Sequence, residues 1–374
     1  MKLETQLVHV GRPIEPGSHA ITPSIVLATT FEREQDGTYE GDVYSRTSTP
    51  NRRNLETALA MLEGGRSAYA FSSGQAAASA VLQSLSAGDH VILPNDLYHG
   101  MRYLVTDILR RWGLQADFVD MRDPEHVSRA VKPNTRLIWV ETPSNPSLQI
   151  ADIAAIAQIA HQAGALYAVD NTWATPIWQK PLDLGADIVM HSTTKYLGGH
   201  SDVLGGALVL REPADGPLSQ RLYTIQKLSG AVPSPFDCWL ILRSLPTLAL
   251  RVRAQTASAG KIAAVLNTHP RIERVNYPGL STHPGHAVAT RQMRGFGAML
   301  SFEIRGGQAE ALAVAAKTAI FARATSLGGV ESLIEHRASV EGPATVTPSN
   351  LLRVSVGLEH PDDLTADLLT ALES

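Results

Sequence analysis

Only one cysteine, Cys238, occurs among the 374 residues, so no disulfide can form within the chain. Long apolar runs are also missing, which argues against a membrane span, and the N-terminal residues lack the apolar core of a signal peptide. The formal charge is −4 and no basic run occurs, which argues against a nucleic-acid partner. These absences favour a protein of the reducing cytoplasm that binds neither membrane nor nucleic acid. Cys238 lies in an apolar segment, so we interpret it as a packing residue.

The composition is that of an ordinary globular protein. Hydrophobic residues make up 44% of the chain and charged residues 18%. A chain of 374 residues is too long for one compact core and suits two domains.

The middle of the chain alternates between short apolar runs and helical patterns. The strands are expected at 67–71, 90–94, 116–120, 136–141, 166–170 and 187–191, and the helices at 54–63, 74–85, 98–112 and 151–164. Apolar strands that lack a polar face and are separated by helices indicate an α/β fold with a mostly parallel sheet buried on both faces. Ligands of such sheets bind beyond the carboxyl ends of the strands.

The two ends of the chain have other patterns. Residues 1–55 are rich in proline and glycine, and we interpret them as an arm that packs on something else. After residue 236 a helical stretch at about 238–265 precedes alternating strands at 297–306 and 351–358, with a helix at 308–318 between them. The sequence therefore predicts an arm (1–55), an α/β domain (56–236) and a smaller α+β domain (237–374).

Lys195 follows a predicted strand and lies in HSTTKYLGGHSD (191–202), among hydroxyl, glycine and histidine residues. A lysine amine attacks a carbonyl group only where its surroundings keep it partly neutral, and nearby hydroxyl groups suit a phosphate. A lysine, a phosphate site and an acid are what pyridoxal 5′-phosphate (PLP) requires, so the segment favours this cofactor. The alternative is a solvated lysine in a turn, the commoner position for this residue.

Two further segments suit PLP. Ser73 and Gly74 begin a predicted helix, whose free N–H groups favour a phosphate, although a simple serine N-cap has the same pattern. Asp170 ends a buried strand, where it would pair with a protonated ring nitrogen or, alternatively, cap the next turn. The connection from Asp170 to Lys195 is long enough to carry a helix, so both side chains can reach one crevice from neighbouring strands.

Several other polar residues stand at informative positions. Tyr44 and Arg46 alternate in the arm, where the arginine suits a phosphate at a dimer interface or is simply exposed. Tyr98 suits ring stacking and proton transfer. Asn145 follows a strand end. Arg353 lies between apolar strand residues, so it needs an anionic partner, either an amino-acid carboxylate or a structural ion pair.

The paired histidines of HPGH (283–286) have no third ligand nearby in the sequence. We therefore interpret the segment as a turn and predict no metal site.

The motifs together resemble the Cys/Met-metabolism PLP enzymes, which include cystathionine γ-synthase, cystathionine γ-lyase, methionine γ-lyase and cystathionine β-lyase. The resemblance runs over nearly the whole chain, and it is the order and spacing of the motifs that make it specific. In order, they are YSR, LEGG, FSSG-x-AA, ETPSNP, VDNT-x-ATP, HSTTKYLGGHSD, SLGGVESL and LLRVSVGLEHPDDL.

The resemblance implies a PLP-dependent transferase of fold type I and a homotetramer built as a dimer of dimers. Lys195 would carry the cofactor as a Schiff base and move protons, Asp170 would pair with its ring nitrogen, and Tyr98 would stack on the ring and act in acid–base steps. The implied cofactor contacts are Tyr44, Arg46, Gly74, Gln75, Tyr98, Asp170, Ser192, Thr194 and Lys195, with Tyr44 and Arg46 reaching in from the neighbouring subunit. The implied substrate contacts are Asn145, Ser326 and Arg353, with Thr325 beside them.

The chain departs from the family pattern at several positions. Gln75 replaces the usual Met, and the residues after YSR differ from the usual N-P-T. Val43 and Thr325 stand where cystathionine enzymes often have acids, and Gly100 stands where methionine γ-lyases often have Cys. These departures leave open whether the reaction is of the γ-synthase or γ-lyase type, or that of a methionine γ-lyase or cystathionine β-lyase. An aminotransferase, or a PLP-binding protein without turnover, are the alternatives of another class.

Overall fold

Two β-sheets organise the structure, a computed structural model that describes residues 1–14, 18–342 and 345–373. The larger sheet has seven strands, of which β7 alone is antiparallel to its neighbours. In spatial order they are β1 (Ser67–Phe71), β7 (Gly206–Leu210), β6 (Ile188–His191), β5 (Leu166–Asp170), β4 (Thr135–Glu141), β2 (His90–Pro94) and β3 (Gln115–Val119). The predicted α/β fold with a mostly parallel sheet is confirmed.

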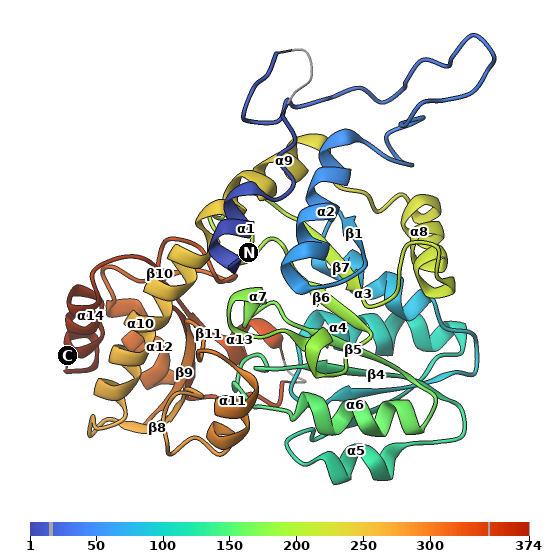
Figure 1. Cartoon of the computed structure of the whole chain (residues 1–374). Coiled ribbons are helices and arrows are strands. Elements are labelled where there is room, and N and C mark those ends of the chain that lie inside the picture. Colours follow the sequence, from blue (N-terminus) through green and yellow to red (C-terminus); the bar gives the residue numbers. More distant parts are fainter. Residues whose placement is uncertain (15–17, 343–344, 374) are drawn as a thin grey trace.

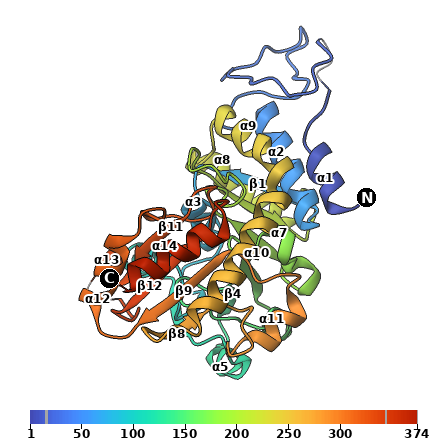
Figure 2. The ribbon, with the colours of Figure 1, turned by 90° about the vertical axis from the view of Figure 1, so that its left-hand side faces the viewer.

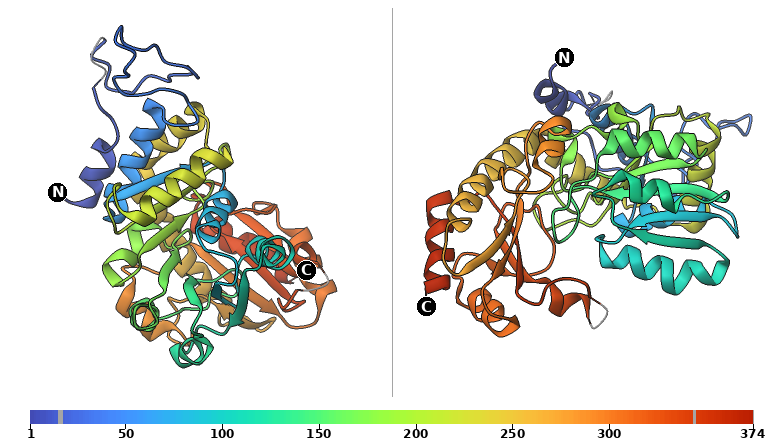
Figure 3. Two further views of the ribbon diagram at one scale, coloured as in Figure 1. Left: turned by 90° about the vertical axis from the view of Figure 1, so that its right-hand side faces the viewer. Right: turned by 90° about the horizontal axis from the view of Figure 1, so that it is seen from below.

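Helices cover both faces of this sheet because its strands are apolar on both sides. In β1, Tyr69 and Phe71 are buried toward one face and Ala68 and Ala70 toward the other. One face packs against α3 (Gly74–Gln83), α4 (His99–Tyr103) and α8 (Pro217–Ser229). The other packs against α2 (Pro50–Glu63), α5 (Pro124–Ala130) and α6 (Ile153–Gln162). Figure 1 and the right-hand view of Figure 3 show these layers.

The smaller sheet has five strands and lies beside the first (Figure 1). Its order is β10 (Ala322–Arg323), β11 (Leu333–His336), β12 (Leu351–Ser355), β9 (Met299–Ile304) and β8 (Ile272–Asn276). All its pairs are antiparallel except β10 with β11. The helices α10 (Leu248–Leu266) and α12 (Gln308–Lys317) pack on it, and α14 (Pro361–Glu373) packs against these two helices. The α+β character predicted for the C-terminal part is confirmed.

Short elements connect the larger ones. They are α7 (Thr175–Trp178), η3 (Pro181–Leu184), α11 (His286–Gln292) and α13 (Arg337–Glu341). His283, at the start of the predicted turn HPGH, accepts a hydrogen bond on Nδ1 from the Gly285 N–H. No helix among the described residues is long and apolar enough to cross a membrane.

The N-terminal region is less irregular than predicted. It contains a helix, α1 (Leu3–His9), which buries Leu7. The helix α2 begins at Pro50 rather than at residue 54, because Thr49 caps it by accepting the Arg52 N–H at 3.2 Å and proline suits the first helical position. Between these helices, residues 18–49 form an extended arm that projects beyond the body of the molecule (Figures 1 and 2).

Two helix predictions are wrong in detail. Residues 98–112 are not one α-helix, because α4 continues as the π-helix η1 (Leu104–Ile108) and the 3-10 helix η2 (Leu109–Trp112). An apolar period near 3.6 residues does not separate these three hydrogen-bonding patterns. The stretch 238–265 is divided into α9 (Pro235–Ser244) and α10 by the turn η4 (Leu245–Thr247), because Pro246 has no N–H to continue a helix.

Candidate active site

A pocket opens at the carboxyl ends of β4, β5 and β6 and is closed on its other side by the C-terminal sheet. Asp170 ends β5, and Lys195 lies in the turn after β6, the strand adjacent to β5. Both side chains line one pocket, as their positions after neighbouring strands predicted. The predicted site residues that line the pocket are Gly74, Gln75, Tyr98, Asn145, Asp170, Ser192, Thr194, Lys195, Thr325, Ser326 and Arg353, with Ser73.

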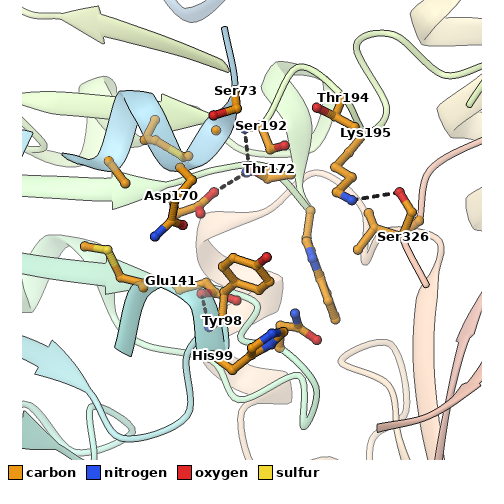
Figure 4. Close-up of a pocket in the computed structure, with 18 of the residues that line it drawn as sticks. Ser73, Tyr98, His99, Glu141, Asp170, Thr172, Ser192, Thr194, Lys195 and Ser326 are labelled. Carbon is orange, nitrogen blue, oxygen red and sulfur yellow. Dashed lines mark hydrogen bonds between the residues drawn. The ribbon is translucent and has the colours of Figure 1, made fainter. Parts of the chain in front are cut away.

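Lys195 points toward Ser326 across the pocket (Figure 4). Its Nζ donates a hydrogen bond to the Ser326 hydroxyl at 2.7 Å. Burial, together with the nearby charge of Arg353, lowers the pKa of Lys195 from 10.5 to about 8. An appreciable fraction of the amine is therefore neutral near pH 8, as a nucleophilic lysine requires.

Asp170 occupies the opposite wall and is fixed by the residues that follow it. Its carboxylate accepts the Thr172 N–H at 2.9 Å, and the Thr172 hydroxyl in turn accepts the Ser192 N–H at 2.9 Å. Burial raises the pKa of Asp170, although the hydrogen bonds from Thr172 oppose this. A cation placed beside Asp170 would stabilise its charged form.

Glu141, at the end of β4, is a second acid in the pocket that the sequence analysis missed. Its carboxylate accepts the Tyr98 N–H at 2.9 Å, which fixes the start of α4. Burial and then the charge of Asp170 raise the pKa of Glu141 well above its usual range. Tyr98 itself is 43% exposed, with its ring beside that of His99 (Figure 4).

The N-terminus of α3 lies against the turn after β6. A Cβ atom at Gly74 would lie only 2.8 Å from the Ser192 Cβ, and one at Gly206 only 2.1 Å from the Ser73 carbonyl oxygen. Both positions therefore require glycine. The close approach places the helix terminus beside the Ser192 side chain, which is an arrangement that suits a phosphate.

Arg353 lies on β12 and is only 3% exposed. It donates hydrogen bonds to the Asn145 side-chain oxygen at 2.9 Å and to the Ser326 carbonyl oxygen at 3.0 Å. It also forms an ion pair at 2.5 Å with Glu335, directly opposite on β11. Burial lowers the pKa of Arg353 to about 10. The guanidinium is thus held rigidly at the pocket wall.

Two predicted residues do not reach this pocket. Arg46 donates a hydrogen bond to the Lys227 carbonyl oxygen at 2.9 Å, near the end of α8, and its guanidinium lies 5.7 Å from the centre of the Tyr44 ring. Tyr44 is 43% exposed. Both residues are carried by the projecting arm.

His99 and Arg337 also line the pocket, although neither was predicted from the sequence. His99 had a weak signal, because it adjoins Tyr98 after a strand end. Arg337 follows β11 and had none, because a charged residue after a strand is usually solvated. In the structure Arg337 is only 1% exposed.

Comparison with known proteins decides the family. The model of the family "Cys/Met metabolism PLP-dependent enzyme" matches residues 4–373. The chain belongs to this family. The predicted resemblance is confirmed, the chain is an enzyme, and its cofactor is pyridoxal 5′-phosphate.

The similar proteins carry different activities. Cystathionine gamma-synthase of Mycobacterium tuberculosis (strain H37Rv) is 47% identical over 98% of this chain and 96% of its own length. Cystathionine beta-lyase MetC of Bacillus subtilis is 44% identical over 99% and 96%. A crystal structure of cystathionine gamma-lyase from Lactobacillus plantarum, complexed with L-serine, has a TM-score of 0.95 and 41% identity, covering 100% of this chain and 99% of that one. These names support a PLP-dependent transsulfuration enzyme and leave the reaction type open.

The pocket fits the cofactor of the family. It offers a lysine amine of lowered pKa, a carboxyl group that favours a cationic partner and a glycine-lined helix terminus beside Ser192. When bound, PLP supplies a carbonyl group for an amine and an electron sink for the carbanion formed at Cα.

Proposed function

We propose that the enzyme catalyses elimination or replacement at Cγ of sulfur amino acids and their precursors, as a cystathionine γ-synthase or γ-lyase. The observation that carries the proposal is that one pocket holds both Lys195 and Arg353. Lys195 has a lowered pKa, and the buried Arg353 suits an amino-acid carboxylate. The three relatives named above are a synthase and two lyases, and none is an aminotransferase.

The positions of the pocket residues support the following roles in holding the cofactor. Lys195 is the attachment point, and Asp170 pairs with the ring nitrogen. The N–H groups of Gly74 and Gln75, at the start of α3, bind the phosphate with the hydroxyl groups of Ser192 and Thr194. Tyr98 covers the ring from the start of α4.

Arg353 and Asn145 bind the substrate α-carboxylate, because their mutual hydrogen bond already places both polar groups at one point of the wall. Ser326 orients the free amine of Lys195 through their hydrogen bond. Lys195 would remove the proton from Cα, release it, and then, as a neutral amine again, remove one from Cβ, as γ-elimination requires. Tyr98 would donate a proton to the leaving group. Thr325, exposed at the pocket mouth, contacts the distal part of the substrate.

The nearby glutamates do not replace the acids absent from positions 43 and 325. Glu331 binds the Ser201 hydroxyl, Glu335 pairs with Arg353, and Glu341 pairs with Arg337. Glu331 alone of these three is in no ion pair among the described residues, and it does not line the pocket. An ammonium at the far end of cystathionine therefore has no free acid of these three within the pocket, which keeps methionine γ-lyase and cystathionine β-lyase activities as outcomes of the assay.

Product analysis tests the proposal. The holoenzyme is incubated with L-cystathionine alone and, separately, with an O-acylhomoserine and L-cysteine, and the products are identified by mass spectrometry. Cysteine, 2-oxobutyrate and ammonia from the first mixture, or cystathionine from the second, is the expected result. Homocysteine and pyruvate from the first mixture would establish a β-lyase and contradict the proposal. If neither mixture gave a product, the substrate would instead be methionine or another thioether.

We further propose a cytoplasmic homo-oligomer, built as a dimer of dimers, in which the arm within residues 1–55 serves the α/β domain (56–236) of a neighbouring subunit. Tyr44 and Arg46 would then complete the phosphate site of that subunit. The arm supports this reading because it carries exposed apolar side chains, among them Ile21 at 77% and Leu27 at 69% exposure. Such residues are commonly buried in an interface. Residues 237–374 form the remaining domain in this proposal.

Subunit mixing tests the shared site. Lys195→Ala and Arg46→Ala should each be nearly inactive alone, because each lacks one part of every site. A mixture reassembled from equal amounts should regain about a quarter of wild-type activity, because about half of the dimers are hybrids and one of their two sites is intact. Arg66→Ala changes a residue outside the pocket and the arm and is the control. A mixture of Arg66→Ala with Lys195→Ala should show only the activity of its Arg66→Ala subunits. If the mixture of Lys195→Ala and Arg46→Ala regained no activity, Arg46 would belong to the active site of its own subunit or to no active site.

A further inference from the structure

His99 lines the pocket directly after Tyr98, and the roles assigned so far leave it unused. Its ring centre lies 4.8 Å from that of Tyr98, with an angle of 58° between the planes. Its Nδ1 lies 3.2 Å from Nη2 of Arg337, which lines the same pocket. A histidine held in this way has a defined chemical form.

The contact with Arg337 determines where the imidazole proton lies. A guanidinium group has only donors, so Nδ1 of His99 must accept the hydrogen bond and cannot carry a proton. His99 is therefore neutral, with its one proton on Nε2. Burial lowers the pKa of His99 and the charge of Arg337 lowers it further, which favours the same neutral form.

Arg337 is itself immobilised. Nη1 donates to Glu335 at 3.0 Å and Nη2 to Glu341 at 3.0 Å, and the residue is 1% exposed. Glu341 is held in turn by the hydroxyl groups of Thr345 and Thr347, each at 2.6 Å. Because Arg337 cannot turn away, the orientation of the His99 ring is fixed as well.

The Nε2–H group of His99 has no protein partner among the described residues. In the part of the chain that the structure describes, Nδ1 has its partner in Arg337, and no hydrogen bond is found for Nε2. His99 is half-buried in a pocket whose α-carboxylate anchor, Arg353, already has Asn145 beside it. An acceptor for the Nε2–H must therefore belong to another part of the substrate.

We propose that His99 determines substrate specificity by donating its Nε2–H to an oxygen atom at the far end of the substrate side chain. The pocket then prefers amino acids whose side chain carries a carboxylate or ester oxygen beyond Cγ, such as O-acylhomoserines or cystathionine, over those that end in an alkyl group or a plain thioether. The inference rests on the proposed function in one respect, the binding of the α-carboxylate at Arg353.

Two ligands of equal side-chain length isolate this contact. L-2-Aminoadipate ends in a carboxylate and L-norleucine in a methyl group, and both are titrated into the holoenzyme while the visible absorption of the cofactor is followed. His99→Phe keeps a ring beside Tyr98 but removes both ring nitrogens, whereas His99→Gln keeps one donor and one acceptor. The preference for aminoadipate over norleucine, as a ratio of Kd values, should fall about tenfold in His99→Phe, and in His99→Gln it should stay within about threefold of wild type.

The result separates this inference from the proposed function. An unchanged ratio in His99→Phe, or an equal loss for both ligands, would overturn the inference and leave His99 as a support for Tyr98. A tenfold fall without any Cγ product in the cystathionine and O-acylhomoserine assays would uphold the inference and contradict the function. If neither amino acid perturbs the absorption of the wild-type holoenzyme, both are contradicted.

Discussion

Lys195→Ala should lower turnover of every amino-acid substrate by about 10⁴-fold or more, because it removes both the nucleophile and the base of the reaction. The visible absorption of covalently bound cofactor should disappear with it. Lys195 contacts Ser326 across the pocket and is not part of an ion pair among the described residues, so the fold should tolerate the change. Turnover by mass spectrometry and an absorption spectrum of the same sample measure both effects.

Lys195→Arg is the matched control for this substitution. It keeps the positive charge in the pocket, but a guanidinium stays protonated at any pH of the assay and is a poor nucleophile. We therefore expect it to be as inactive as the alanine variant, with a melting temperature close to that of the wild type. Turnover within about tenfold of wild type in either variant would contradict the assignment of Lys195.

Arg353→Leu should raise KM for amino-acid substrates by about 100-fold, because the α-carboxylate loses its charged partner. It should also lower the free energy of unfolding by about 3 kcal/mol, since Glu335 is buried and would keep only Arg337 as an ion-pair partner. Steady-state kinetics and denaturant unfolding measure the two effects separately.

The double substitution Arg353→Leu with Glu335→Gln distinguishes the two roles of the arginine. Removing the carboxylate charge should restore most of the stability, while KM stays high because the α-carboxylate still has no partner. If KM returned to the wild-type value together with stability, Arg353 would be a structural residue. An unchanged KM in the single variant would equally exclude it from substrate binding.

The part of the site that lies at the strand ends of the larger sheet was predictable from the sequence. Asp170 and Lys195 follow the ends of two apolar strands, and parallel strands of such sheets meet at one edge, so their proximity follows from local pattern alone. The same holds for Ser73 and Gly74 at the start of α3. Arg353, on its strand, was also correctly expected to have an anionic partner. The sequence alone did not decide whether this partner was a substrate carboxylate or a protein side chain.

The remainder of the site depends on contacts between distant segments. Glu335 faces Arg353 only because β11 and β12 pair in this register, and His99 meets Arg337 across the boundary between the two sheets. Neither pairing leaves a periodic signal in the sequence. The internal division of residues 98–112 was missed for another reason: η1 and η2 are each about one turn long, too short for their different periods to show in the apolar pattern.

Hydrogen exchange at Cβ tests the central claim, Cγ chemistry in this pocket, most directly. γ-Elimination requires loss of a Cβ proton after the Cα proton, whereas β-elimination and transamination require loss of the Cα proton alone. The holoenzyme is incubated in D₂O with L-norvaline, which has no leaving group, and the amino acid is followed by proton NMR. We predict exchange of the Cα and Cβ protons with solvent in the wild type and of neither in Lys195→Ala. Exchange confined to Cα would contradict the γ-synthase or γ-lyase assignment.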